Sequence, residues 1–244
     1  MNNFSATLKD SIRMLRVLII RALFSRQKKL MPGTVSLILA PHPDDEVFGC
    51  SGLMQQLLHS GKELYIVILT SGEGSHRNCC DVDTVTLASN RRALAEKTNR
   101  LLGINNDHLF FLCYDDGNIN FLSNGTCKLK EIIDSIQPDT IFVPHHSEGW
   151  TDHLATREIG LKLASKQASV YEYCVWFWFY NTWNLDWKNV FILSMTKAEH
   201  ILKNRAIDTY ILPKAPCGKP WSGVLPKVFI KATRWNKELY FKIK

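Results

Sequence analysis

The sequence lacks the cysteine patterns of disulfide-stabilised proteins and of thiolate metal sites. Its seven cysteines are an odd number, and no two of them form a C-x-x-C pair. Neither a disulfide framework nor a zinc site built from cysteines is therefore predicted. The adjacent Cys79 and Cys80 are interpreted as free thiols. This cysteine usage is typical of a reducing, cytosolic compartment.

The chain also lacks a hydrophobic run long enough to cross a membrane. The apolar stretch MLRVLIIRALF near the N-terminus is interrupted by Arg16 and Arg21, and it is far shorter than the roughly 20 residues that a membrane span needs. It is followed by SRQKK, without the small-residue cleavage site of a signal peptide. We therefore predict neither a transmembrane helix nor a secretory signal.

Internal repeats, low-complexity tracts and flexible linkers are absent from the sequence as well. The 244 residues are 45% apolar, which is enough to bury one sizeable core. We therefore predict one domain over residues 31–244, preceded by a basic amphipathic segment over residues 1–30.

Acidic residues are in the minority, since 23 Asp and Glu oppose 30 Lys and Arg, for a net charge of +7. The excess favours an anionic partner, such as a phosphorylated substrate or a lipid surface, although a basic, solvated surface accounts for it equally well. No nucleic-acid-binding motif is recognisable, so nucleic acid is not expected as a partner. The sequence leaves open whether the chain forms oligomers.

The N-terminal segment concentrates this positive charge. Seven basic residues lie from Lys9 to Lys29, against one acid, Asp10. On a helical wheel the basic side chains of Lys9, Arg13 and Arg16 lie opposite the apolar side chains of Ile12, Leu15, Ile19 and Leu23. This pattern predicts a helix within residues 8–29 that rests on anionic lipid at the inner face of a membrane. A helix packed on the domain, or a contact between two copies, explains the pattern equally well.

The most informative stretch is residues 34–52, TVSLILAPHPDDEVFGCSG. Residues 34–40 are almost wholly apolar and bounded by glycine and proline, which predicts a strand buried on both faces. The chain then turns, and Asp44 or Asp45 can cap a helix that ends near Gly61. The polar side chains between the strand and the helix lie where open α/β sheets bind ligands.

A metal ion would explain the charges in this turn. The consecutive carboxylates of Asp44, Asp45 and Glu46 repel one another, and a bound cation would remove that repulsion. His42 and Asp45 are three residues apart and can converge on one ion, because imidazole nitrogen and carboxylate oxygen suit zinc. Asp44 points roughly 100° away on the first turn and is free to act as a base toward a metal-bound water. An acidic helix cap without a metal is the alternative.

Further strands and helices alternate along the chain. Apolar runs predict strands at residues 63–69, 108–113, 140–143 and 190–195, and an aromatic strand at residues 171–180. Helices are predicted at residues 84–102, 128–136, 151–167 and 197–205. Residues 228–244 alternate and carry charge, as edge structure does. The alternation predicts an α/β fold with a mostly parallel sheet.

The strand at residues 140–143 leads into a second polar loop, PHHSEGWTDH. As after the first strand, a loop rich in His and Asp runs into a helix at the same edge of the sheet. His153 is the natural third metal ligand, giving two histidines and one carboxylate with a position left for water. Asp152 is placed to fix a ring tautomer. A helix cap or a surface position for His153 is the alternative.

Two patterns in these loops resemble a known family. The pattern A-P-H-P-D-D-E-x-x-x-C-x-G at residues 40–52 resembles the first signature of the PIG-L/LmbE family of zinc-dependent deacetylases of N-acetyl sugars, and W-T-D-H at residues 150–153 resembles the second, H-x-D-H. The resemblance covers residues 34–210 in outline and implies a Rossmann-like three-layer sandwich. It implies one zinc ion per chain, or another divalent metal, held by His42, Asp45 and His153, with Asp44 as the base.

The resemblance also implies a substrate and its contacts. The substrate would be an N-acetylated sugar, and the basic N-terminus favours a nucleotide-linked or lipid-linked form in surface-glycan synthesis. Arg92 lies near the position of a family arginine that faces the sugar. Asp116, in a D-G turn, is expected to accept hydrogen bonds from sugar hydroxyls, although an Asp-Gly pair also forms ordinary turns.

One position departs from the family pattern. Trp150 stands where the family has a histidine that stabilises the oxyanion or protonates the leaving amine. We expect His146, rather than His145, to take that role, and Trp150 to bind a sugar face. A relative that keeps the metal and binds glycans with impaired catalysis is the alternative.

Overall fold

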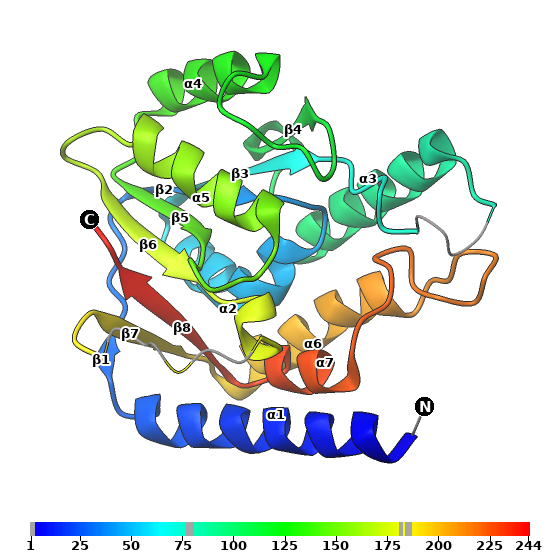
Figure 1. Ribbon diagram of the computed structural model, residues 1–244. Coiled ribbons are helices and arrows are strands. Elements are labelled where there is room, and N and C mark those ends of the chain that lie inside the picture. The colour runs from blue at the N-terminus through cyan, green and yellow to red at the C-terminus, as the bar shows by residue number, and fades with distance from the viewer. Residues whose placement is uncertain (1–2, 77–80, 181–182, 184–186) are drawn as a thin grey trace.

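The chain builds one sheet that is covered by helices on both faces (Figure 1). The computed structural model describes residues 3–76, 81–180, 183 and 187–244, with side chains from residue 8 onward. Cys79 and Cys80 lie outside the described residues. Four described cysteines, Cys50, Cys113, Cys127 and Cys174, are free thiols.

The described residues form an eight-stranded sheet in the order β1-β7-β8-β6-β5-β2-β3-β4. The strands are β1 (Lys28–Lys29), β2 (Val35–Ala40), β3 (Glu63–Thr70), β4 (Leu109–Tyr114), β5 (Thr140–Pro144), β6 (Ser169–Tyr173), β7 (Val190–Ser194) and β8 (Lys237–Lys242). Neighbouring strands run parallel except for β8, which is antiparallel to β6 and β7. The prediction of an α/β fold with a mostly parallel sheet is confirmed.

The helices form the two outer layers. They are α1 (Asn3–Phe24), α2 (Asp45–His59), α3 (Thr84–Leu101), α4 (Asn124–Ile136), α5 (Thr151–Leu163), α6 (Lys197–Ile211) and α7 (Lys227–Thr233), with short 3-10 turns η1 (Asn106–His108) and η2 (Trp176–Trp178). Helices α2, α3 and α6 pack together on one face of the sheet, and α4 and α5 lie on the other (Figure 1). Within β2, Ile38 joins the first of these cores and Leu39 the second, so the strand is buried on both faces as its sequence predicts.

The position of β2 in the sheet explains where a ligand would bind. β2 pairs with β3 on one side and with β5 on the other, so the chain crosses to the opposite side of β2 after β4. The carboxyl ends of β2 and β5 therefore lie at a topological switch point, where open α/β sheets form a ligand crevice.

The structure corrects two predictions for the C-terminal half. β8 is an interior strand, which lies between β7 and β6. Its buried Glu238 is tolerated there because Lys203 Nζ lies 2.8 Å from Glu238 Oε1 and neutralises the charge. The aromatic strand predicted at residues 171–180 ends at Tyr173. Beyond it, Glu148 accepts hydrogen bonds from the backbone N–H groups of Val175 and Trp176, and the chain turns into η2.

Helix α1 packs against one face of strands β7 and β8 and along α7 (Figure 1). Its side chains Val17, Ile20 and Phe24 are fully buried there. Within the described ranges, no helix combines the length and the apolar character that a membrane crossing requires.

Candidate metal centre

The turn between β2 and α2 holds the first set of polar side chains. β2 ends at Ala40 and α2 begins at Asp45, so His42 and Asp44 lie at the switch point. Asp44 has φ 125° and ψ −28°, a conformation that side-chain-bearing residues rarely adopt and that costs about 1–3 kcal/mol. Glycine would adopt this backbone conformation with less strain, but it would not supply a carboxylate to the crevice.

Glu46 holds this strained turn in place. Its Oε2 atom accepts a hydrogen bond from the Asp44 N–H at 2.9 Å, and its Oε1 atom accepts from Tyr210 Oη at 2.7 Å and Asn99 Nδ2 at 3.0 Å. The third acid of the D-D-E run is therefore buried and fully hydrogen-bonded on the α2, α3 and α6 side. Because these hydrogen bonds occupy both of its oxygens, Glu46 stabilises the turn and is not a candidate metal ligand.

Three side chains form a candidate metal site across the two loops. The Asp45 Oδ2 atom lies 3.2 Å from His42 Nδ1 and 3.3 Å from His153 Nε2, and one donor atom from each residue lies within 4.8 Å of the others. His153 is fully buried, yet neither of its ring nitrogens has a hydrogen-bond partner in the described structure. Buried polar atoms are nearly always paired, so the donor set fits a divalent cation such as Zn²⁺.

Each candidate histidine ligand lies beside a carboxylate that orients it. Asp152 Oδ2 is 3.3 Å from His42 Nε2, and Asp152 itself accepts hydrogen bonds from the backbone N–H groups of Gly117 and Ile119. Asp152 therefore supports His42, from the other loop, and not its neighbour His153. Such carboxylate–histidine pairs fix the ring tautomer in metal sites.

Glu148 is the residue that sequence reasoning missed. Its Oε2 atom lies 3.4 Å from His153 Nδ1, and backbone N–H groups of Val175 and Trp176 donate hydrogen bonds to its two oxygens. The side chain is fully buried. The available sequence signal was an acid in a His-rich loop, S-E-G-W, but its partners come from the turn after β6 and could not be read from spacing.

Asp116 also contacts the metal site rather than projecting freely into the crevice. Its Oδ1 atom lies 3.3 Å from His42 Nε2, and its Oδ2 atom accepts a hydrogen bond from the Gly74 N–H at 2.6 Å. Burial works to raise the pKa of Asp116, but the hydrogen bond and charge of His42 outweigh it and hold the pKa below its usual range. The D-G turn is therefore built into the floor of the site.

Arg91 is the arginine that reaches the site. Its guanidinium lies 3.2 Å from Asp44 Oδ2 and donates hydrogen bonds to the carbonyl oxygens of Pro43 and Gly72. The structure corrects the expectation for Arg92, whose exposed side chain pairs with Glu96 and lies over the Phe111 ring. The two arginines are adjacent on α3, so their side chains point about 100° apart. The sequence does not show which of the two faces the site.

The charges in the site do not balance. Burial raises the pKa of Asp44 to about 7, against the opposing charge of Arg91. Burial works to lower the pKa of His42, but hydrogen bonds with Asp116, Asp152 and Asp45 raise it well above its ordinary value. The cluster therefore attracts positive charge, as a cation site does.

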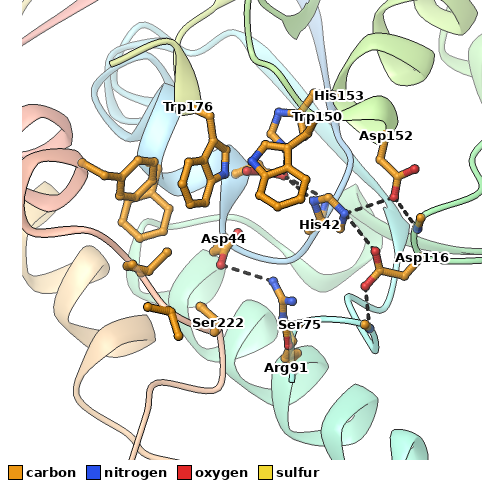
Figure 2. A pocket seen from close by; sticks show the side chains of 18 of the residues that line it. His42, Asp44, Ser75, Arg91, Asp116, Trp150, Asp152, His153, Trp176 and Ser222 are labelled. Carbon is orange, nitrogen blue, oxygen red and sulfur yellow. Dashed lines mark hydrogen bonds and ion pairs between the residues drawn. The ribbon is translucent and has the colours of Figure 1, made fainter. Parts of the chain in front are cut away.

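A cavity of about 470 Å³ opens above these residues (Figure 2). Arg91 is the one arginine or lysine among the described residues that line it. Trp150 and Trp176 stand at its rim with ring centroids 5.6 Å apart, and Trp150 is 46% exposed. Ser75 and Ser222 border the opposite side, near Arg91 (Figure 2). The volume is that of a small-molecule site.

A sequence model of the PIG-L family, described as GlcNAc-PI de-N-acetylase, matches residues 37–164. This match covers more than half of the chain and includes all three candidate metal ligands. The chain belongs to the PIG-L family. A search of curated proteins finds no match.

Solved structures share the fold of this PIG-L chain. The N,N'-diacetylchitobiose deacetylase from Pyrococcus horikoshii aligns with a TM-score of 0.59 and 22% identity, over 86% of this chain and 79% of that one. A deacetylase triple mutant of the teicoplanin biosynthetic pathway aligns with a TM-score of 0.66 and 13% identity, over 86% and 97%. The 4-carboxy-2-hydroxymuconate hydratase GalB from Pseudomonas putida KT2440 aligns with a TM-score of 0.57 and 16% identity, over 72% and 78%. The fold thus hosts more than one chemistry.

His146 does not lie in the cavity of this PIG-L chain. Its Nδ1 atom is 3.0 Å from Glu172 Oε2, and its ring lies against that of His145 at 4.1 Å. Arg157 donates a further hydrogen bond to Glu172. The structure therefore corrects the expectation that His146 reaches the space next to Trp150: β5 continues to Pro144, and Glu172 of the neighbouring strand holds the His146 ring.

Proposed function

We propose that this chain is a divalent-metal-dependent hydrolase that removes the N-acetyl group from an amino sugar. The observation that carries the proposal is the convergence of His42, Asp45 and His153, in which Nε2 of buried His153 lies 3.3 Å from Asp45 Oδ2 without a hydrogen bond. Membership of the PIG-L family supports this reaction class. The shared fold alone would not, since a hydratase adopts it too.

Three protein ligands are one fewer than zinc usually takes, so a water or the acetyl carbonyl would complete the set. A bound divalent ion supplies Lewis acidity, lowering the pKa of a water toward about 7 and polarising a carbonyl. Asp45 supplies the oxygen of the donor set. The two histidines are each oriented by another carboxylate, His42 by Asp152 and His153 by Glu148. The chain thereby offers a rigid set of two nitrogens and one oxygen.

Asp44 is the proposed proton carrier. Asp44 is 6% exposed, and burial brings the pKa of its carboxyl group to about 7, near the value at which a group both accepts and releases a proton at neutral pH. The proton that Asp44 Oδ takes from the attacking water would pass to the nitrogen of the leaving amine. Arg91, at 3.2 Å from Asp44 Oδ2, holds the carboxyl in place for this transfer.

The aromatic rim is proposed to bind the sugar. Trp150 and Trp176 offer apolar faces above the metal ligands, and a sugar ring has apolar C–H faces that pack on such rings. The net charge of +7 favours a nucleotide-linked or lipid-linked sugar from surface-glycan synthesis.

Acetate release from the zinc-loaded protein tests the proposal. Nucleotide sugars, lipid-linked sugars and thiol glycosides that carry an N-acetyl group would each be offered, and one class should release acetate. Asp44→Asn should remove the activity while leaving the zinc content at one ion per chain. If no class is hydrolysed by protein that holds zinc, the proposed reaction is wrong.

The rim also supports a second candidate, a metal-bearing glycan-binding protein with impaired catalysis. Among the described residues that line the cavity, the histidines are His42 and His153, both candidate ligands. Trp150 stands where the family pattern has a further histidine. In this case Trp150→His should raise acetate release above that of the natural chain, whereas an active enzyme that uses Trp150 as a sugar platform should lose substrate affinity.

A further inference from the structure

Helix α1 exposes a row of large apolar side chains, which we call its outer face. The members are Leu8, Ile12, Leu15, Leu18, Ile19 and Leu23, and each is between 38% and 59% exposed. Their spacing follows the helical repeat, so they form one continuous stripe along the helix. Contiguous apolar stripes on a protein surface mark interaction sites.

The opposite side of α1 fixes this orientation. Val17, Ile20 and Phe24 are fully buried against the strands β7 and β8 and helix α7. Arg16, only 2% exposed, donates a hydrogen bond to the Phe177 carbonyl oxygen at 2.6 Å, and Arg21 donates to the carbonyl oxygen of Ala232. The outer face is therefore held outward by the folded domain.

This arrangement changes the expected role of the basic stripe. Arg13 lies over the Phe179 ring at 4.1 Å and pairs with Asp10, and Arg16 is buried. These arginines attach the helix to the domain, and the apolar stripe is the side left open. The helix thus both packs on the domain and presents an amphipathic surface.

Positive charge flanks the outer face. Lys9, Arg26, Lys28 and Lys29 are exposed near its ends, and Asp10, the one acid within residues 8–29, lies 3.0 Å from Arg13. Cations beside an apolar stripe match the headgroup and acyl layers of an anionic bilayer.

We propose that the outer face of α1 docks on the surface of an anionic lipid bilayer, with the helix axis parallel to that surface. The apolar side chains would enter the boundary between headgroups and acyl chains, and the flanking cations would meet lipid phosphates. Self-association through the same face is disfavoured, because it would bring these cations of two copies together in a protein of net charge +7. The proposal is independent of the reaction at the metal site.

Co-sedimentation of the full chain with vesicles tests the docking. Vesicles that contain phosphatidylglycerol should bind the protein at least about tenfold more tightly than vesicles of phosphatidylcholine alone, and added salt should weaken the binding. Ile12→Gln combined with Ile19→Gln should lower the affinity by about tenfold or more, because both side chains leave water on docking. Lys28→Gln combined with Lys29→Gln should remove most of the preference for the anionic lipid.

Ile201→Gln is the matched control. Ile201 is 51% exposed on α6, so its replacement removes a similar apolar side chain from a different surface and should leave vesicle binding unchanged. Circular dichroism should show the same helix content in every variant. Failure of the natural chain to bind anionic vesicles overturns the proposal. So does a dimer, measured by light scattering, that the Ile12 and Ile19 replacements dissociate.

Discussion

Two buried carboxylate sites in this chain satisfy their charges differently. Glu238, on β8, accepts hydrogen bonds at 2.8–3.0 Å from Lys203, Tyr240 and the backbone N–H groups of Gly52 and Leu53. Both oxygens have two donors, and Lys203 neutralises the charge. The Glu238 site is closed, so it needs nothing from outside the chain.

The cavity site has no such balance. Asp44, Asp45, Asp116 and Asp152 converge on two histidines and one arginine, and the ring nitrogens of buried His153 have no hydrogen-bond partner. The difference teaches that burial of acids by itself does not indicate a ligand. An incomplete set of partners does, because folding alone would select a closed network.

Removing the oxygen ligand from the cavity site should have the largest effect. Asp45→Asn should abolish stoichiometric zinc binding and lower acetate release by about 10³-fold or more, since metal chemistry supplies several kcal/mol of transition-state stabilisation. Zinc content by elemental analysis and acetate release would be measured together. Retention of one zinc per chain would show that Asp45 is not a ligand.

Breaking the closed site should instead lower the stability of the fold and leave the metal site intact. Lys203→Met should lower the free energy of unfolding by about 3–5 kcal/mol, because it leaves the buried charge of Glu238 unpaired. Urea denaturation would measure the loss, and zinc content should stay at one per chain. Adding Glu238→Gln should restore part of the stability. A zinc loss in the folded Lys203→Met protein would contradict the separation of the two sites.

Glu148 should have an intermediate effect. Glu148→Gln weakens the orientation of His153, so zinc affinity should fall by about 10–100-fold, as for other partners of metal-bound histidines. Titration with a competing chelator would measure the affinity. Glu158→Gln, on the exposed surface of α5, is the matched control and should leave the zinc affinity unchanged.

Relieving the strain at Asp44 should give the smallest effect on stability. Asp44→Gly should be more stable than Asp44→Ala by about 1 kcal/mol, because both variants lose the ion pair with Arg91 and only glycine tolerates φ 125°. Urea denaturation would measure the difference, and acetate release should be lost in both. Gln137→Gly is the control, since Gln137 has φ 46° at the end of α4, and it should keep full activity. An Asp44→Gly protein no more stable than Asp44→Ala would show that the turn is not strained.

Much of the fold could be predicted from sequence because the parallel strands are buried on both faces. Their unbroken apolar runs predicted β2, β3, β4 and β5 to within one or two residues. β8 was misread, since Lys237 and Glu238 look like surface charges until the partner Lys203, 35 residues away, is known. Pairing across the chain is not visible in local periodicity.

The three candidate metal ligands could be predicted from the sequence, but several of the residues around them could not. The loops after β2 and β5 bring His42, Asp45 and His153 together because parallel strands end at one edge. The roles of Arg91 and Glu148 depended on how a helix is rotated and on backbone donors in a later turn, so spacing could not assign them. The structure likewise turned His146 away toward Glu172.

Helix α7 lies between α1 and the cavity. Val228 and Ala232 pack with Val17 and Ile20 of α1, while Phe229, between them, lines the cavity. One short helix therefore contacts α1 on one side and lines the cavity on the other, where a bound ligand would touch it. If either contact shifts α7, the two binding events become thermodynamically linked, and each would alter the strength of the other by the same factor.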